Sequence, residues 1–134
     1  MIRRILMSLT LLVLSSGPVY AEWVVVSNDL TREATAYVSP DLVLRKENLV
    51  TMWHLFDYKT IQIGGTGEHP FLSLMAQAEY DCEEARLRVL TMTVFSGNMG
   101  RGHGVSSAPD ADRTWKPIVP ESIAHALWKV ACSK

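Results

Sequence analysis

A glycine-rich stretch at residues 96–107, SGNMGRGHGVSS, carries the residue types of a phosphate-binding loop. Such loops bind phosphate because a helix begins directly after them and points free backbone N–H groups at the anion, and the P-loop form also needs Lys followed by Ser or Thr. Neither feature follows Gly104, since residues 105–107 are typical of a strand and a Pro-Asp loop comes next. We therefore predict a long turn between two strands in which glycines adopt positive φ angles, with an anion-binding nest of N–H groups as the alternative.

The four histidines are the next candidates for chemistry, and they are scattered along the chain. The spacing that places two metal ligands on one helix face, His-x-x-x-His, does not occur. His54 and Asp57 share a predicted strand, where residues three apart point to opposite faces, so they form no local catalytic dyad. We expect structural or surface histidines, no metal site, no cofactor and no catalytic residue. The alternative is an enzyme whose fold brings His54, Asp57 and His103 together.

The first 21 residues have the organisation of a secretory signal peptide. Arg3 and Arg4 precede an apolar run over residues 5–14, and short side chains lead up to Ala21. The apolar run is shorter than the roughly 20 residues that span a bilayer. We predict cleavage between Ala21 and Glu22 and export to the periplasm or the medium, with a retained membrane anchor as the alternative. No cysteine stands directly after the apolar run, so a bacterial lipoprotein anchor is not predicted.

The mature chain, residues 22–134, is long enough for one domain with a single modest core. It carries 11 Lys and Arg residues against 14 Asp and Glu residues, a formal charge of −3. Proteins that bind nucleic acid are usually basic, so this balance argues against a nucleic-acid partner. We also expect no transmembrane segment in the mature chain, because no second apolar run approaches membrane length.

The chain contains two cysteines, Cys82 and Cys132. An even number of cysteines in an exported protein predicts a disulfide, here one that closes a loop of about 50 residues. In the chain-entropy model, such a bridge raises the free energy of unfolding by at most about 4 kcal/mol. The alternative, a reactive thiol, lacks a Cys-x-x-Cys motif or neighbouring residues that would activate it.

Alternation of apolar and polar residues predicts several β-strands. It is clearest over residues 74–81, where the apolar residues share one face. Because a short connection, residues 82–85, joins this strand to the next, the two should pair antiparallel. Glycines and a proline predict a loop over residues 59–70. The predicted strands cover residues 22–27, 33–38, 42–45, 49–58, 74–81 and 86–96.

One amphipathic helix is predicted over residues 121–131. Its apolar residues recur with the spacing of one helix face, and Pro120 precedes it. A continued helix would place Cys132 away from that face, so either the helix ends before Cys132 or the disulfide lies at the rim of the core. Strands followed by one helix predict an α+β fold, an antiparallel β-sheet covered on one face by a C-terminal amphipathic α-helix. The uncovered face must be polar or meet a partner.

A series of short motifs runs through the mature chain. They are EWVV at 22–25, AYV at 36–38 with Pro40, the aromatic-rich run 53–58, EYDC at 79–82, GNMG at 97–100, WKPI at 115–118, and PES at 120–122 before the helix that leads to Cys132. In this order, with the paired cysteines, they resemble the surface-adhesin protein E family of small exported bacterial proteins. The resemblance implies a curved antiparallel sheet and a disulfide from the EYDC segment to the end of the C-terminal helix. It also implies binding of host extracellular-matrix proteins, and dimerisation.

The predicted function is an exported, non-enzymatic domain that binds a protein partner, by resemblance a host extracellular-matrix protein. Arginine and aromatic residues favour interfaces, so exposed loop residues are the candidate contacts. These candidates are Arg101, His103, Arg113 and Lys116. The alternative is a soluble periplasmic structural or envelope-associated protein with no host ligand, which the missing lipidation cysteine favours.

Overall fold

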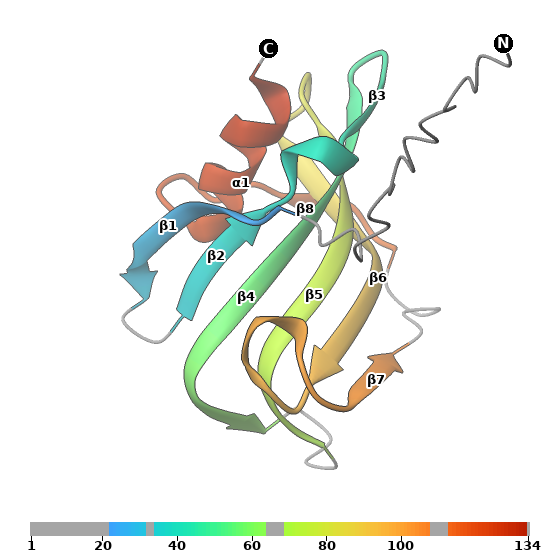
Figure 1. The fold of residues 1–134 in the computed structure, drawn as a ribbon. Helices are drawn as coiled ribbons and strands as arrows, with labels where there is room; N and C mark the ends of the chain where they lie inside the picture. The colour runs from blue at the N-terminus through green and yellow to red at the C-terminus, as the bar shows by residue number, and fades with distance from the viewer. Residues whose placement is uncertain (1–21, 32–33, 64–68, 108–112, 134) are drawn as a thin grey trace, which may run out of the picture.

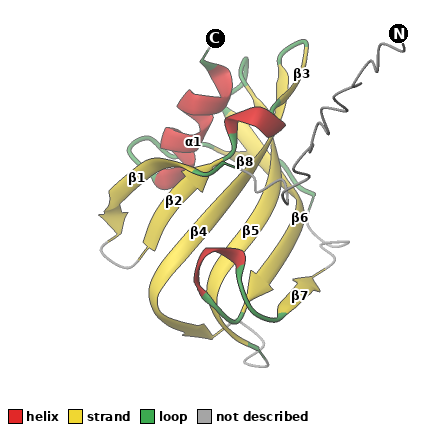
Figure 2. Ribbon diagram, viewed as in Figure 1, coloured by secondary structure: helices red, strands yellow, loops and turns green. Residues whose placement is uncertain are grey.

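A computed structural model describes residues 22–31, 34–63, 69–107 and 113–133. These residues form one antiparallel sheet and one C-terminal α-helix, so the predicted α+β class is confirmed (Figures 1 and 2). The main strand order is β1-β2-β4-β5-β6-β7, while β3 pairs with β4 and β8 pairs with β6. The predicted signal peptide and its cleavage point at Ala21 lie outside the described residues. The elements are β1 (Val24–Thr31), β2 (Ala34–Val38), the 3-10 turn η1 (Pro40–Leu42), β3 (Leu44–Lys46), β4 (Leu49–Ile63), β5 (Pro70–Asp81), β6 (Arg86–Phe95), the 3-10 turn η2 (Asn98–Gly100), β7 (Gly104–Ser107), β8 (Lys116–Pro117) and α1 (Ile123–Cys132).

The central strands β4 and β5 are longer than predicted. The expected loop over residues 59–70 is wrong at both ends, because β4 continues to Ile63 and β5 begins at Pro70. Beyond an irregularity in the ladder these two residues pair with each other, while residues 64–68 lie outside the described part. Isoleucine and threonine before the first glycine favour the extended backbone, and proline is tolerated as the first residue of a strand.

The core lies between the sheet and α1. Successive side chains of a strand point to opposite faces, and the helix side of the β4–β5 ladder carries Val50 opposite Tyr80 and Met52 opposite Ala78. Burying each large apolar side chain stabilises the fold by about 1.5–3 kcal/mol. The buried cluster consists of Val38, Val50, Met52, Ala78, Tyr80, Leu127 and Ala131.

The helix α1 is shifted from its predicted bounds of 121–131 to Ile123–Cys132. Glu121 has a φ of 64°, which lies outside the right-handed helical region, so the helix begins later than predicted. Ser122 is the N-cap, and its Oγ accepts the backbone N–H of His125 at 3.1 Å. Such a cap satisfies one of the free N–H groups of the first turn.

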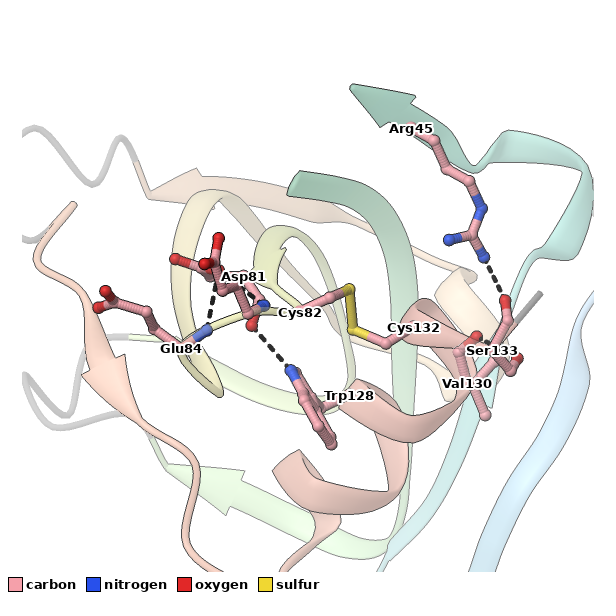
Figure 3. The surroundings of a disulfide bond; sticks show 9 residues. Arg45, Asp81, Cys82, Glu84, Trp128, Val130, Cys132 and Ser133 are labelled. Atoms are coloured by element: carbon pink, nitrogen blue, oxygen red, sulfur yellow. Dashed lines mark hydrogen bonds between the residues drawn. A yellow bond between two sulfur atoms is a disulfide. The ribbon is translucent and has the colours of Figure 1, made fainter. Parts of the chain in front are cut away.

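Cys82 and Cys132 form the predicted disulfide, with their Cα atoms 5.6 Å apart (Figure 3). The first of the two alternatives for Cys132 is wrong, because the helix does not end before it; Cys132 is the last helical residue. Both cysteines are partly buried against the core cluster, so the bridge lies at the rim. Beside it, the indole Nε1 of Trp128 donates to the backbone oxygen of Asp81 at 2.9 Å. The bridge and this hydrogen bond attach α1 to the end of β5.

The glycine-rich stretch is a turn between β6 and β7, as predicted. Phe95 pairs with Gly104, which closes the hairpin, and Gly100 and Gly102 have φ angles of 71° and 84°. Met99 shares this left-handed conformation, with a φ of 56°. The turn folds back over the face of the sheet opposite α1 (Figure 2). The side chains nearest to Gly100 are those of Met75 and Leu55, which lie on that face.

Candidate functional site

The turn around η2 covers one half of the sheet face opposite α1. The carboxylate of Asp57 accepts hydrogen bonds from the Asn98 side-chain amide at 3.0 Å and from the backbone N–H of Met99 at 2.8 Å. The buried hydroxyl of Ser73 donates to the Gly97 oxygen at 2.7 Å and accepts the Gly100 N–H at 2.9 Å. The backbone N–H groups of Met99 and Gly100 are therefore already satisfied by side chains of the sheet. These two N–H groups are therefore not available to bind an anion, which argues against the alternative of an anion-binding nest.

The other half of this face presents aromatic, amide and charged side chains. We define the open face as Trp53, Gln77, Glu79, Arg88 and Trp115. Trp53 lies opposite Gln77 in the ladder between β4 and β5, and Glu79 lies opposite Arg88 between β5 and β6. The four residues on strands alternate with the buried residues of the helix side, and none of the five is fully buried. The sheet face that α1 leaves uncovered is therefore covered in one half by the turn and forms the open face in the other half.

Charged groups hold Trp115 against β6. The guanidinium groups of Arg86 and Arg88 lie 4.6 Å and 4.5 Å from the centre of the Trp115 ring. Arg88 also forms an ion pair with Glu79, at 2.6 Å between Nη2 and Oε1. A cation over an aromatic face is attracted by the electrons of the ring, so these contacts restrain the indole, and Trp115 stays partly exposed.

A second ion pair joins Arg86 to Asp81, with 3.0 Å between Nε and Oδ2. Burial alone would raise the pKa of Asp81, but hydrogen bonds from the Glu84 N–H, the Arg86 side chain and the Glu83 N–H outweigh it and lower that pKa. The carboxylate thus stays charged and fixes the tight turn between β5 and β6. This turn positions both arginines that contact Trp115.

The residues of the alternative enzyme do not come together. His54 is buried on the helix side of β4, whereas Asp57 faces the opposite side and is bonded to the η2 turn. His103 is exposed in the connection between β6 and β7. Burial lowers the pKa of His54 to about 4, so its imidazole is neutral at physiological pH. Within the described ranges, no group of three or more His, Cys, Asp or Glu side chains is placed to hold a metal ion.

The four candidate partner contacts fall into two pairs at opposite ends of β6. Arg101 and His103 are exposed in the turn next to Phe95, whereas exposed Lys116 pairs with Leu87. Phe95 lies eight positions after Leu87 along β6, roughly 25 Å at the usual rise per residue. Leu87 lies on the helix side of β6, so the side chain of its partner Lys116 also points to that side, away from the open face. Arg113 is exposed and lies two residues before Trp115 in the sequence.

Sequence reasoning missed the open face. The alternation of side chains along a strand could have identified Trp53, because its neighbours Met52 and His54 are buried on the other face. No local pattern places Trp115, which comes to lie against β6 because the next two residues, Lys116 and Pro117, pair with Leu87 and Arg86.

Comparisons with known proteins agree with this architecture. The H. influenzae protein E crystal structure from a non-typeable strain superposes with a TM-score of 0.60 at 9% identity, over 85% of this chain and 77% of that chain. A second crystal form of Haemophilus influenzae protein E gives a TM-score of 0.57 at 10% identity, over 84% of this chain and 96% of that chain. At such identities the likeness concerns the fold. No curated protein sequence matches this chain.

The described part contains no helix with the length and apolar character needed to cross a bilayer. Residues 23–133 match the family profile described as Surface-adhesin protein E, which is nearly all of the chain after the predicted signal peptide. The match includes both cysteines of the disulfide and every residue of the open face. The chain therefore belongs to the Surface-adhesin protein E family and is an adhesin-like protein.

Proposed function

We propose that this protein is an exported, non-enzymatic binding domain whose open face contacts a protein partner, and that this partner is a host extracellular-matrix protein. The observation that carries the proposal is that Arg88 restrains Trp115 on a partly exposed face of the sheet, in a protein of the Surface-adhesin protein E family. Tryptophan and arginine contribute most to protein interfaces, because they combine large apolar area with directed polar contacts.

Preorganisation supports this face over the exposed loops. Arg88 is bonded to Glu79 and lies over Trp115, so binding would immobilise few additional rotamers. The cost of ordering a long side chain on binding is about 0.5–1.5 kcal/mol, and a side chain that is already restrained avoids part of it. Arg113, two residues before Trp115 in the sequence, would extend the contact at the rim, where charges mainly set the association rate.

The test is surface plasmon resonance of the purified protein over a panel of immobilised matrix glycoproteins and collagens. Trp115→Ala should weaken binding to the preferred matrix protein by roughly tenfold or more. Arg113→Ala should mainly slow association and reduce its dependence on salt. Lys129→Ala on the exposed side of α1 is the matched control. Absence of saturable binding at micromolar concentration over the whole panel would contradict the matrix-binding proposal.

The location is a separate part of the proposal. Family membership supports an exported surface protein, and protease shaving of intact cells distinguishes this location from the periplasm. Loss of the protein while periplasmic markers survive would support the surface location. Full protection until the outer membrane is permeabilised would instead support the alternative, a soluble periplasmic structural or envelope-associated protein without a host ligand.

We also propose that the chain forms a homodimer. Ile61 and Ile63, at the end of β4, are 65% and 71% exposed, and adjacent exposed aliphatic side chains of this kind favour association. Sedimentation velocity should show a dimer that Ile61→Lys/Ile63→Lys converts to a monomer. The matched pair Thr60→Lys/Gln62→Lys, at alternating positions of the same strand, should leave the dimer intact. A monomer of the unmodified protein at tens of micromolar would contradict this proposal.

A further inference from the structure

Both ends of the C-terminal segment, which we define as residues 115–132, attach to the tight turn between β5 and β6 at residues 82–85. Near the start of the segment, the backbone N–H of Ile118 donates to the oxygen of Ala85 at 3.0 Å. At its end, the disulfide joins the last residue of α1 to Cys82 (Figure 3). The segment therefore leaves the turn with strand β8 and returns to the same four residues through a covalent bond.

The start of the C-terminal segment carries Trp115, the residue of the open face that lies outside the strands. Its ring contacts the guanidinium groups of Arg86 and Arg88. Arg86 directly follows the turn and forms an ion pair with Asp81, which directly precedes it. The Asp81 carboxylate also accepts two backbone N–H groups of the turn. The turn thus positions both the residues against which Trp115 rests and the strand from which Trp115 extends.

The conformation of this turn depends on its attachments. Ala85 has a φ of 47°, a left-handed conformation that is unfavourable for a residue with a side chain and persists only where the surroundings hold it. On the side of α1, the indole of Trp128 donates to the Asp81 oxygen at 2.9 Å, next to the disulfide at Cys82. The disulfide is the only covalent cross-link available to the chain, because the sequence has two cysteines.

We propose that the Cys82–Cys132 disulfide is a redox switch for the open face. While the bridge is intact, the turn holds Trp115 in place; reduction by a dithiol releases the end of α1, loosens the turn and weakens binding at Trp115. Both cysteines are only partly buried, which leaves the bridge open to attack by a small thiol. The loss of binding rests on the function proposed above, whereas the loosening of Trp115 does not.

The reduction is a thiol–disulfide exchange with the dithiol as the two-electron reductant. One thiolate of the reductant attacks a sulfur of the bridge, and the other cysteine leaves as a thiolate. The second thiol of the reductant then displaces the first cysteine and closes the reductant's own disulfide. The two thiol protons of the reductant end on Cys82 and Cys132.

Two-dimensional NMR with and without dithiothreitol, well below the melting temperature of both forms, tests the switch without a partner. Reduction should shift the indole N–H resonance of Trp115 and accelerate amide exchange at Ile118 roughly tenfold or more. Trp53 is the internal control, because it lies on the same face but is held by the ladder between β4 and β5, and its resonance should not move. Trp128→Phe, with the bridge intact, should produce a smaller shift at Trp115, whereas Trp23→Phe should produce none.

Surface plasmon resonance tests the effect on binding. The reduced protein is alkylated with iodoacetamide and freed of reductant, so that disulfides of the immobilised matrix proteins stay intact. It should bind the preferred matrix protein about five- to tenfold more weakly than the oxidised form, and Cys82→Ser/Cys132→Ser should show the same loss.

The possible outcomes separate this inference from the proposed function. Absence of matrix binding by the oxidised form would contradict the proposed function, and the NMR comparison would then decide whether the bridge controls Trp115. The switch is overturned if reduction leaves Trp115 and Ile118 unchanged, or if a matrix protein binds both forms equally. Loss of amide protection throughout the sheet on reduction also overturns it, because the bridge would then hold the whole fold and not the open face.

Discussion

The carboxylate of Asp57 accepts a hydrogen bond from the backbone N–H of Met99 at 2.8 Å, across 42 residues of sequence. Met99 has a positive φ, which is costly for a residue with a side chain. Together with the bond from the Asn98 amide, this contact fixes the β6–β7 turn against the face of the sheet that α1 leaves uncovered. The Asp57 carboxylate and the Ser73 hydroxyl, both on strands of the sheet, together fix the position of the turn.

Removing this carboxylate should loosen the turn. We expect Asp57→Ala to lower the free energy of unfolding by about 1–3 kcal/mol, because it leaves a partly buried N–H group unsatisfied. Asp57→Asn keeps an acceptor oxygen and should cost less. Urea denaturation measures both values, and amide exchange at Met99 should accelerate. Asp41→Ala, an exposed position on η1, is the control and should change stability by less than about 0.5 kcal/mol. Equal stability of the two alanine variants would refute the role of Asp57.

The Cys82–Cys132 disulfide should contribute a large part of the stability. Replacing both cysteines with serine removes a cross-link between residues 50 positions apart, for which chain entropy gives an upper value of about 4 kcal/mol. The melting temperature should fall by about 10 °C or more, and reduction of the unmodified protein should produce the same shift. A melting curve that does not change on reduction would show that the bridge has no structural role.

Burial of His54 should make the protein sensitive to mild acid. The folded pKa of about 4 lies below the ordinary value of 6.5, so between these values only the unfolded chain takes up the proton. The free energy of unfolding should therefore fall as the pH is lowered from about 6.5 to 4, by up to about 3 kcal/mol. His54→Phe should flatten this dependence in urea titrations at several pH values. His103→Phe, at an exposed histidine, should retain it.

The lowered pKa of Asp81 should act at more acidic pH. Its folded pKa lies below the unfolded value of about 4, so its contribution is complete above that value and is lost as the pH falls through the folded pKa. Asp81→Asn should be less stable than the unmodified protein at pH 7, and the difference should narrow below pH 4. Urea titrations between pH 3 and 7 test this, with Asp41→Asn as the control. A difference that is constant across this range would contradict the assignment.

Local sequence patterns were sufficient for the main strands and the helix, but not for the short strand β8 or for all the bounds. Alternation over residues 74–81 and the helical spacing after Pro120 report local backbone geometry, and both elements are present. The continuation of β4 to Ile63 depends on its pairing with Pro70, a contact that no local pattern encodes. Helix α1 includes Cys132 because the bridge attaches its last turn to the end of β5.

By itself the sequence determined the disulfide, the antiparallel sheet with its C-terminal helix, and the turn character of the glycine-rich stretch. Composition and short-range periodicity express these features directly. Only the tertiary structure decided that the turn binds Asp57, that Trp115 rests on two arginines of β6, and that both ends of the C-terminal segment attach to the β5–β6 turn. These sites join residues far apart in the chain, and their contacts exist only after the strands have paired in one register.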